Sequence, residues 1–478
     1  MSLSRVTLIS PNSGEKERIE SEGAWPPLGL VYMGTVLENA GHEVTIIDNA
    51  RAQLPDERLI DRVRRECPDI VGISALTPTF RRALRIASSV KEALPDSKVV
   101  LGNYHATFEY ERILKNCPFV DLVVLGEGEM TMLDLAEAVD KGKDVGDVRG
   151  VALRENGGVL RTAPRPPVRN LDELPFPNRR LLGWEYFSEV VGMRTSSGRF
   201  TTVVTSRGCP HGCRYCACSA FTSRTVRFRS PENVVDEMEM LWSEGYEEVG
   251  FVDDNFLLNQ KRVDKICELI RKRKIRMDLW VEGRTDQASL ETMRNLAKAG
   301  CRAIYFGIES GNEHVLKYYG KNVTPEISRR AVSNARRAGI DTVIGSFIVG
   351  APIETMSDVR RTFDFAMSLR DMDFPQMNVL YLSPGMDLWN AAVRDGYLSE
   401  DEFWDSAVPA VEVYPSGVGL DELKREIDEF YRKFLGRKSY LMFQAIKTLG
   451  SRWRLEALIK NIVEGRSFRG AVRHLRGD

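Results

Sequence analysis

Three cysteines in the middle of the chain have the spacing C-x3-C-x2-C and could bind metal. Cys209, Cys213 and Cys216 directly follow the β-type run TTVVTSRG. Thiolates are the usual ligands of iron–sulfur clusters, and three on one loop can ligate three irons of a four-iron cluster and leave the fourth iron open. A zinc site would need a fourth nitrogen or sulfur ligand, for which Cys218 and His211 are candidates. A disulfide is the weaker alternative, because disulfides are rare in cytosolic chains.

The segments after these cysteines alternate between short apolar strands and amphipathic helices. The expected strands contain EVGFVDD, MDLWVEG, AIYFGIES, DTVIGSFIVG and QMNVLYLS, and helical segments such as SPENVVDEMEMLWSEG separate them. Together with the strand that carries the cysteines, this pattern predicts six strands and a partial (β/α)6 barrel of the TIM type. Chemistry in such a barrel belongs at the carboxyl ends of the strands.

Polar side chains gather where these strands end. They are Asp253, Asp254 and Asn255 after the second strand, Glu282 and Arg284 after the third, and Glu309 and Ser310 after the fourth. The fifth strand continues as GSFIVGAPIE, which contains Ile348 and Gly350, and Tyr215 immediately precedes the third cysteine. These positions are candidates for ligand binding. For Glu282 and Arg284 the alternative is an internal ion pair that braces the barrel.

Residues 1–145 predict a separate α/β domain. Five apolar strands alternate there with helical segments, which indicates a parallel, Rossmann-like or flavodoxin-like sheet with helices on both faces. Ligands of such sheets bind outside the carboxyl ends of the strands. The candidate residues in these loops are Pro27, Leu28, Ser74, Leu76, Thr77, Thr79, Gly102, Asn103, Tyr104, His105, Gly126, Glu127, Gly128 and Glu129. No G-x-G-x-x-G follows the first strand, which argues against a dinucleotide.

Length and composition describe a globular protein of two or three domains. The chain has 478 residues, a net charge of -1 and 43% hydrophobic residues, which excludes disordered and fibrous classes. We expect a Rossmann-like domain at 1–145, a proline-rich linker or strap at 146–195, the barrel at 196–390 and a helical region at 391–478. No apolar run approaches the ~20 residues that span a bilayer, and the start has no signal-peptide core, so the sequence predicts a cytoplasmic protein.

The end of the chain is strongly basic. From Arg432 on, twelve Lys or Arg residues stand against three acidic residues. A basic amphipathic tail can dock on an anionic membrane, an acidic protein or nucleic acid, whereas the simpler reading is a solvated helical face. Nothing in the sequence resembles a nucleic-acid-binding fold, so we expect no nucleic-acid partner.

The N-terminal motifs PPLGL, AGHEV, GISALTPTF, VVLGNYHAT and LGEGE together resemble the cobalamin-binding domain that precedes many radical enzymes. The sequence lacks the D-x-H-x-x-G motif, whose histidine would ligate cobalt. The resemblance therefore implies that cobalamin is bound without a histidine ligand. Asn103 and Tyr104 stand where the family usually has Gly-Pro before His105.

The cysteine spacing and the barrel pattern resemble the radical S-adenosylmethionine (SAM) enzymes, and the whole chain resembles the class B, cobalamin-dependent branch. This resemblance implies a [4Fe-4S] cluster, SAM and cobalamin as cofactors. It implies that residues 253–255 hold the methionine amino group, and that Glu282, Arg284, Glu309 and Ser310 hold the ribose hydroxyls and the carboxylate. It also implies that the strand with Ile348 and Gly350 lies along the adenine. Tyr215 resembles the aromatic residue that the family usually has just before the third cysteine.

The resemblance further implies a reaction. The reduced, oxygen-sensitive cluster would give an electron to SAM, so the enzyme would work anaerobically with a reductant such as flavodoxin or ferredoxin. The resulting 5′-deoxyadenosyl radical would take hydrogen from an unactivated carbon, and cobalamin would deliver a methyl group to it. The leading hypothesis is C-methylation at an sp3 carbon of a large substrate, a peptide, protein or lipid. A radical cyclase, a methylthiotransferase and a non-catalytic cobalamin or iron–sulfur sensor are the alternatives.

Overall fold

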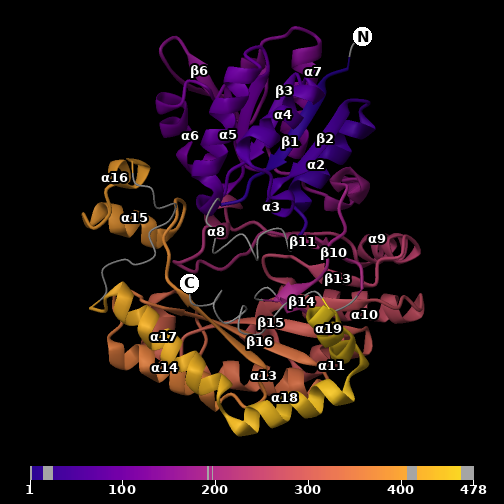
Figure 1. Cartoon of the computed structure of the whole chain (residues 1–478), viewed down its shortest axis with the longest axis vertical. Coiled ribbons are helices and arrows are strands. Elements are labelled where there is room, and N and C mark those ends of the chain that lie inside the picture. The colour runs from indigo at the N-terminus through magenta and orange to yellow at the C-terminus, as the bar shows by residue number, and fades with distance from the viewer. Residues whose placement is uncertain (1–2, 14–24, 191–192, 196–197, 406–416, 464–478) are drawn as a thin grey trace. The chain divides into compact units, whose positions relative to one another are not determined.

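The structure is a computed structural model that describes residues 3–13, 25–190, 193–195, 198–405 and 417–463 (Figure 1). The chain divides into two compact units. Unit 1 comprises residues 1–185 with two short segments from further along the chain, and unit 2 comprises the remainder. Each unit is described by itself.

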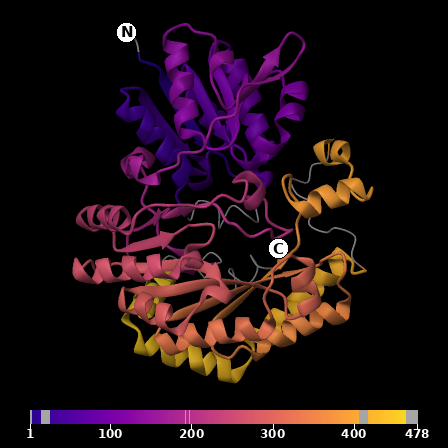
Figure 2. The ribbon, with the colours of Figure 1, turned by 180° about the vertical axis from the view of Figure 1, so that it is seen from behind.

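Unit 1 is built on a sheet with the strand order β2-β1-β3-β4-β5-β6-β7. Its parallel strands are β1 (Arg5–Ser10), β2 (Glu43–Asp48), β3 (Ile70–Ser74), β4 (Lys98–Gly102) and β5 (Leu122–Val124). Its helices, which flank the sheet in Figures 1 and 2, are α2 (Leu28–Asn39), α3 (Asn49–Ala52), α4 (Asp56–Glu66), α5 (Phe80–Ala93), α6 (Tyr104–Asn116) and α7 (Glu129–Asp140). The order 2-1-3-4-5 of the parallel strands is that of a flavodoxin-like sheet, in which the switch point lies between β1 and β3.

The sheet is larger than the sequence predicts. Two antiparallel strands, β6 (Val151–Glu155) and β7 (Gly158–Arg161), extend it beyond β5. They lie in the segment 146–195, which the sequence predicts to be a linker or strap. The sequence did not predict this hairpin, because its strands are short and charged residues flank its turn, Asn156-Gly157. Arg154 fastens this hairpin by donating hydrogen bonds to four backbone carbonyls between Leu114 and Val120.

Unit 2 contains the six-stranded parallel sheet that the sequence predicts. The strands run in chain order as β10 (Phe200–Val203), β13 (Glu248–Phe251), β14 (Asp278–Arg284), β15 (Cys301–Glu309), β16 (Thr342–Val349) and β17 (Phe374–Val379). The helices between them are α8 (Cys218–Phe221), α9 (Pro231–Ser243), α10 (Gln260–Lys272), α11 (Leu290–Lys298), α12 (Glu313–Tyr318), α13 (Pro325–Ala338) and α14 (Met356–Ser368). Two small hairpins, β8 (Glu189–Val190) with β9 (Met193–Arg194) and β11 (Ser206–Arg207) with β12 (Arg227–Phe228), accompany the sheet.

Alternation along the strands gives the sheet of unit 2 an outer and an inner face. Leu279 and Val281 of β14 pack into the main apolar core with the helices, whereas Trp280 belongs to a separate cluster with Ala303 and Ile344. We call the side of Trp280 the inner face. Because side chains alternate along a strand, Glu282 and Arg284 also start from this inner face.

The C-terminal helices are α15 (Asp387–Arg394), α16 (Glu400–Asp405), α17 (Leu420–Leu435), α18 (Lys438–Gly450) and α19 (Arg452–Val463). Helix α17 buries Phe430, Tyr431 and Phe434 in the main core of unit 2, and the Tyr431 hydroxyl accepts a hydrogen bond from the Met377 backbone N–H at 2.9 Å. Helices α17 and α18 run along α14 and α13 (Figure 1). Among the described helices, none is both long enough and apolar enough to span a bilayer.

Part of the basic charge of the tail is neutralised within unit 2. Lys447 of α18 and Arg454 of α19 pair with the buried carboxylate of Asp373, and Arg454 also pairs with Asp341 at 2.6 Å. Opposite charges around it lower the pKa of Asp373 despite its burial. The simple picture of a uniformly solvated basic face is therefore wrong for these two cations, because they fasten α18 and α19 to the amino ends of β16 and β17.

Candidate functional site

The cysteine loop begins at Gly208, where the backbone leaves no room for a side chain. Gly208 has φ +94°, and a Cβ there would collide with the carbonyl oxygen of Thr225. Its backbone N–H donates to the Asp254 carboxylate at 2.7 Å. A second glycine, Gly320 with φ +69°, lies against the backbone of Gly212 on the far side of the loop. The loop is therefore held by the ends of β13 and α12.

The Asp253 carboxylate is held by contacts within unit 2. Its carboxylate accepts hydrogen bonds from the Thr205 backbone and hydroxyl and from the Ser206 hydroxyl, all within 2.6 Å. Arg262 of α10 binds the Thr205 carbonyl at 2.7 Å. Burial raises the pKa of Asp253 against these hydrogen bonds. Asp253 thus ties β13 to the segment leading into the cysteine loop, and its carboxylate has little capacity left for a ligand.

Asn255 is better suited to meet a ligand. The residue is 3% exposed, and neither its Oδ1 nor its Nδ2 has a hydrogen-bond partner among the described residues. Buried amides normally have partners, since an unsatisfied polar group costs about 1–3 kcal/mol. A bound carboxylate or amine, such as those of methionine, would supply the missing hydrogen bonds, so the site fits SAM here.

The three thiols fit a cluster. Cys209, Cys213 and Cys216 are free and partly exposed, and the Cys216 N–H donates to the Cys213 carbonyl at 3.0 Å, which turns the loop between them. A hydrogen bond from the Cys218 thiol lowers the pKa of Cys216 to about 7, which favours a thiolate. Burial raises the pKa of Cys209 and Cys213. Cys218 itself is buried at the start of α8.

The arrangement differs from that of a single metal ion. Among the described residues, no three His, Cys, Asp or Glu side chains surround one common point at metal-ligand distance. A four-iron cluster needs no such point, because each thiolate binds a different iron. Arg284 places Nη1 3.8 Å from the Cys213 sulfur, and this positive charge favours the thiolate form.

Tyr215 and Glu309 form a buried network that the sequence did not reveal. The Tyr215 hydroxyl donates to Glu309 Oε1 at 3.0 Å, and Lys321 Nζ lies 2.5 Å from the same oxygen. The Lys321 and Glu309 side chains are 3% and 7% exposed, and Lys321 also donates to the Gly307 carbonyl at 2.8 Å. Glu309 has φ +69°, a strained conformation for a residue with a side chain. The ion pair holds this strained strand end against the cysteine loop.

Glu282 and Arg284 do not pair with each other. Arg284 donates two hydrogen bonds to the Asp286 carboxylate, a bidentate ion pair in which both nitrogen–oxygen distances are 3.0 Å. Glu282 has no hydrogen-bond or ion-pair partner among the described residues. Its neighbours desolvate the carboxyl enough to raise its pKa to about 7, although the residue remains exposed. The alternative of an internal ion pair between them is therefore wrong, and Glu282 stays available to a ligand on the inner face.

An inner polar strip on β15, β16 and β17 was missed in the sequence. We use this name for Tyr305, Ser346, Gln376 and Asn378. The Tyr305 hydroxyl donates to Gln376 at 3.1 Å, the Gln376 amide donates to Asn378 at 3.3 Å, and Asn378 donates to Ser346 at 3.1 Å. The available signal was the polar residue at alternate positions of otherwise apolar strands.

The remaining predicted residues of unit 2 lie in different surroundings. Ser310 is fully buried and shares a hydrogen bond with Thr362 of α14 at 3.1 Å, so it anchors a helix rather than facing a ligand. Ile348 packs with Tyr215 in one apolar cluster. Gly350, with φ +93°, donates its N–H to the Glu354 carboxylate at 2.8 Å. Burial raises the pKa of Glu354 to about 7.

Glu354 should make stability depend on pH. Its folded-state pKa of about 7 lies above the ordinary glutamate value of 4.5, so between these values the folded state holds a proton that the unfolded state has lost. The stability contributed by Glu354 therefore falls as pH rises from 4.5 to 7, by on the order of 3 kcal/mol. We expect urea midpoints of Glu354→Gln to change less over pH 5–8 than those of the wild type. Parallel midpoint curves would contradict this expectation.

The predicted cobalamin-binding loops of unit 1 meet at the carboxyl edge of its sheet. Asn103, with φ +82°, links two of them, since its amide donates to Ser74 Oγ at 2.9 Å. Leu76 is an exposed apolar residue, and Gly126, with φ +78°, has open space where a side chain would stand. The other predicted residues of this edge are Pro27 and Leu28 at the start of α2, Thr77 and Thr79 before α5, Gly102 and Tyr104 around Asn103, and Glu127, Gly128 and Glu129 at the start of α7.

One residue of this edge was missed. Asn12 follows β1 and is 4% exposed, and its Oδ1 has no hydrogen-bond partner among the described residues. It lies beside the switch point between β1 and β3, where flavodoxin-like sheets bind ligands. An exposed apolar residue, an open glycine and an unsatisfied buried amide fit a large ligand with an apolar ring and polar side groups.

His105 is buried beneath this edge. It is 1% exposed, its Nδ1 lies 3.1 Å from Thr77 Oγ1, and its ring centroid is 3.9 Å from that of Phe80. Burial lowers the pKa of His105 to about 3, so the ring is neutral. The other described histidine of unit 1, His42, precedes β2 and so lies at the opposite edge of the sheet.

We therefore expect cobalamin to bind in the base-off state, with neither its own base nor a nitrogen atom of the protein on cobalt. The electron paramagnetic resonance spectrum of the bound Co(II) form should show no nitrogen superhyperfine splitting, and His105→Ala should leave that spectrum unchanged. Thr77→Val is the matched control, since it removes the hydrogen bond to His105 and keeps the imidazole. Splitting that disappears in His105→Ala would overturn the expectation.

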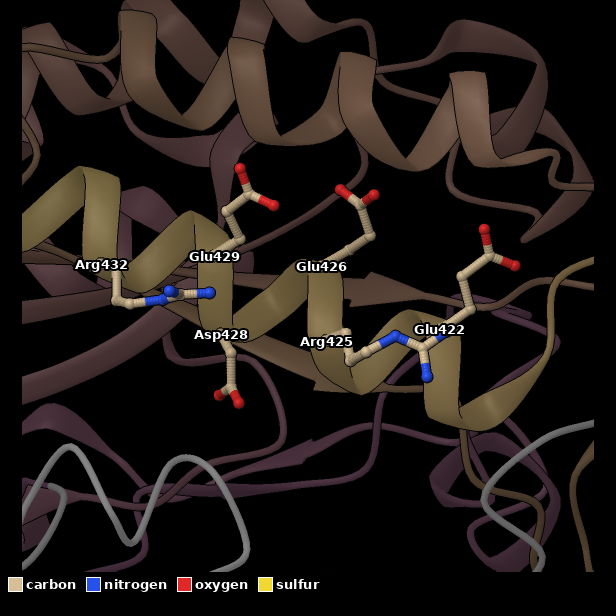
Figure 3. A pocket seen from close by; sticks show the side chains of 6 residues that line it. All are labelled: Glu422, Arg425, Glu426, Asp428, Glu429 and Arg432. Atoms are coloured by element: carbon tan, nitrogen blue, oxygen red, sulfur yellow. The ribbon is translucent and has the colours of Figure 1, made fainter.

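A surface hollow on α17 carries no comparable chemistry. Figure 3 shows its lining of Glu422, Arg425, Glu426, Asp428, Glu429 and Arg432, all from one helix. Glu426 pairs with Arg360 of α14 at 2.6 Å, and Glu429 pairs with Lys433 at 2.7 Å. Mixed charges on the exposed side of one helix are those of a solvated surface.

Two family profiles match the two units. The radical SAM superfamily profile matches residues 203–366, and the B12 binding domain profile matches residues 18–136. An uncharacterized methyltransferase of Pyrococcus horikoshii is 33% identical over 98% of this chain and 96% of its own length. An anaerobic magnesium-protoporphyrin IX monomethyl ester cyclase of Rubrivivax gelatinosus is 30% identical over 95% of this chain and 82% of its own. The radical SAM methyltransferase TsrM of Kitasatospora setae has the same fold, with a TM-score of 0.67 and 22% identity, covering 82% of this chain and 76% of its own.

The chain belongs to the cobalamin-dependent radical SAM family, in its methyltransferase branch. It is a methyl-transferring enzyme whose cofactors are a [4Fe-4S] cluster, SAM and cobalamin. These cofactors and the fold class were predicted from the sequence, and both predictions are confirmed.

Proposed function

We propose that the enzyme methylates an unactivated sp3 carbon of a large substrate, a peptide, protein or lipid. The observation that carries the methyl transfer is the match over nearly the whole length of both chains to a protein named as a methyltransferase. The proposed cluster ligands are Cys209, Cys213 and Cys216, and the electron comes from a reductant such as flavodoxin or ferredoxin. Together the three cofactors supply radical hydrogen abstraction and a transferable methyl group.

The chain's own residues would bind and orient the reactants. Asn255 would bind the methionine moiety through its unsatisfied amide, and Tyr215 and Ile348, which share one apolar cluster, would provide the wall beside it. Glu282 and the inner polar strip offer a carboxyl, a phenol, two amides and a hydroxyl on one face of the sheet. These groups would fix a polar part of the substrate and so hold one carbon in reach of the radical.

The alternative is a cobalamin-dependent, oxidative ring-forming reaction, which the 30% identity to a cyclase favours. The two reactions leave different products. The purified enzyme, with its cluster reduced, would be given SAM with a deuterated methyl group and, separately, lipid and peptide extracts. Label found on a carbon of one substrate class supports methylation of that class. Loss of substrate hydrogen with no transferred label would replace the proposal by ring formation.

A further inference from the structure

Helices α18 and α19 expose an unusual amount of aliphatic surface. The residues more than half exposed are Leu441, Met442, Ile446 and Leu449 on α18 and Ile459, Ile462 and Val463 on α19. Leu449 is 80% exposed and Val463 is 79% exposed. We call these seven residues the apolar face. Exposed apolar patches of this kind on a folded protein commonly mark an interaction surface.

The spacing shows that the exposure follows from how the two helices are attached. Met442, Ile446 and Leu449 recur at helical intervals, as do Ile459, Ile462 and Val463. The opposite sides of the helices are already used, because Lys447 and Arg454 are paired with Asp373 and Trp453 packs against the cluster of Trp280. The sides of α18 and α19 that face unit 2 thus carry ion pairs, and the sides that face solvent are aliphatic. This reverses the usual order for a helix at a water-exposed surface.

The charges around the apolar face are nearly all positive. Lys438 and Lys460 are exposed, and α18 contains no acidic residue. Glu456, the one acid in α19, is paired with Arg452 at 2.7 Å. The sequence after α19 lies outside the described residues, and it contains Arg466, Arg469, Arg473 and Arg476 against Glu464 and Asp478. By contrast, the exposed side of α17 carries both acidic and basic side chains (Figure 3).

We propose that α18 and α19 dock on an anionic lipid bilayer and lie in its interface. Aliphatic side chains on one side of a helix with flanking Lys and Arg are the pattern of interfacial helices, which combine apolar burial with attraction to anionic headgroups. The surface would bring unit 2 to lipids without crossing the membrane. The proposal goes beyond the methylation reaction and does not depend on it.

The test is binding of the complete holoenzyme to vesicles without SAM or turnover. Vesicles of phosphatidylcholine alone are compared with vesicles that also contain phosphatidylglycerol, and bound protein is measured by cosedimentation. We expect binding to the anionic vesicles to be roughly tenfold stronger or more, and to weaken with added salt. Equal binding to both compositions, or no binding to either, would overturn the proposal.

Variants locate the surface. Leu449→Glu combined with Ile462→Glu should lower binding to anionic vesicles at least tenfold. The matched control is Tyr397→Glu, which places a carboxylate at an exposed residue outside the apolar face and should bind like the wild type. Unchanged cobalamin content and circular dichroism show that each variant is folded. Equal binding by the double variant and the wild type contradicts the proposal, as does a dimer in solution that the double variant abolishes, since the face would then join two copies of the chain.

Discussion

Replacing Cys209, Cys213 and Cys216 together by alanine should remove all cluster iron and reduce 5′-deoxyadenosine formation to background. The three thiols are the sulfur ligands that the loop offers, and each would bind a different iron. The loop should keep its course, because Gly208 is fixed by Asp254 and by its positive φ rather than by metal. Iron analysis, visible absorption and product quantification under anaerobic conditions provide the measurements.

Cys218→Ala is the matched control for this prediction. Cys218 is buried and its thiol hydrogen-bonds to Cys216, so the variant loses that hydrogen bond but none of the three proposed ligands and should keep its iron. The same loss of iron in Cys218→Ala as in the triple variant would make Cys218 a fourth ligand. Retention of full iron by the triple variant would show that the cluster is bound elsewhere.

Lys321→Met should be the most destabilising single substitution near the site. It leaves the Glu309 carboxylate buried without its cation, and Glu309 is already held at φ +69°. Breaking a buried ion pair by removing one partner typically costs about 3–5 kcal/mol. We expect a loss of that size in the free energy of unfolding, measured by urea denaturation, together with weaker cluster retention because Tyr215 donates to the same carboxylate.

The double variant Lys321→Met/Glu309→Gln separates the ion pair from general packing. Since both charges are gone, it should recover a large part of the stability lost in Lys321→Met. If the losses of the two single substitutions simply add in the double variant, the two residues do not interact energetically. The ion pair between Arg273 and Asp236, at 2.5 Å on the surface of unit 2, serves as the exposed comparison. We expect Arg273→Met to lower the free energy of unfolding by less than about 1 kcal/mol.

The sequence determined the parts of the protein that depend on local pattern. Strand and helix periods run through both units, so the six parallel strands of unit 2 and the five parallel strands of unit 1 were predictable. The cysteine spacing is itself a local property of one loop. The hairpin of β6 and β7 was not predictable in the same way, because its strands are short and contribute few apolar residues to the pattern.

The tertiary structure decided which polar side chains pair within the fold and which remain available to a ligand. Asp253, Asp254 and Asn255 are adjacent in sequence, but only contacts with Thr205 and Gly208 occupy the first two and leave the third unsatisfied. Lys321 lies twelve residues after Glu309, and the sequence does not reveal that these two residues form an ion pair. Lys447 and Arg454 appear in the sequence as members of a basic tail, yet they neutralise Asp373. Hydrogen bonds and ion pairs are formed between side chains that the fold brings together, and burial then sets their protonation, so neither follows from the order of residues alone.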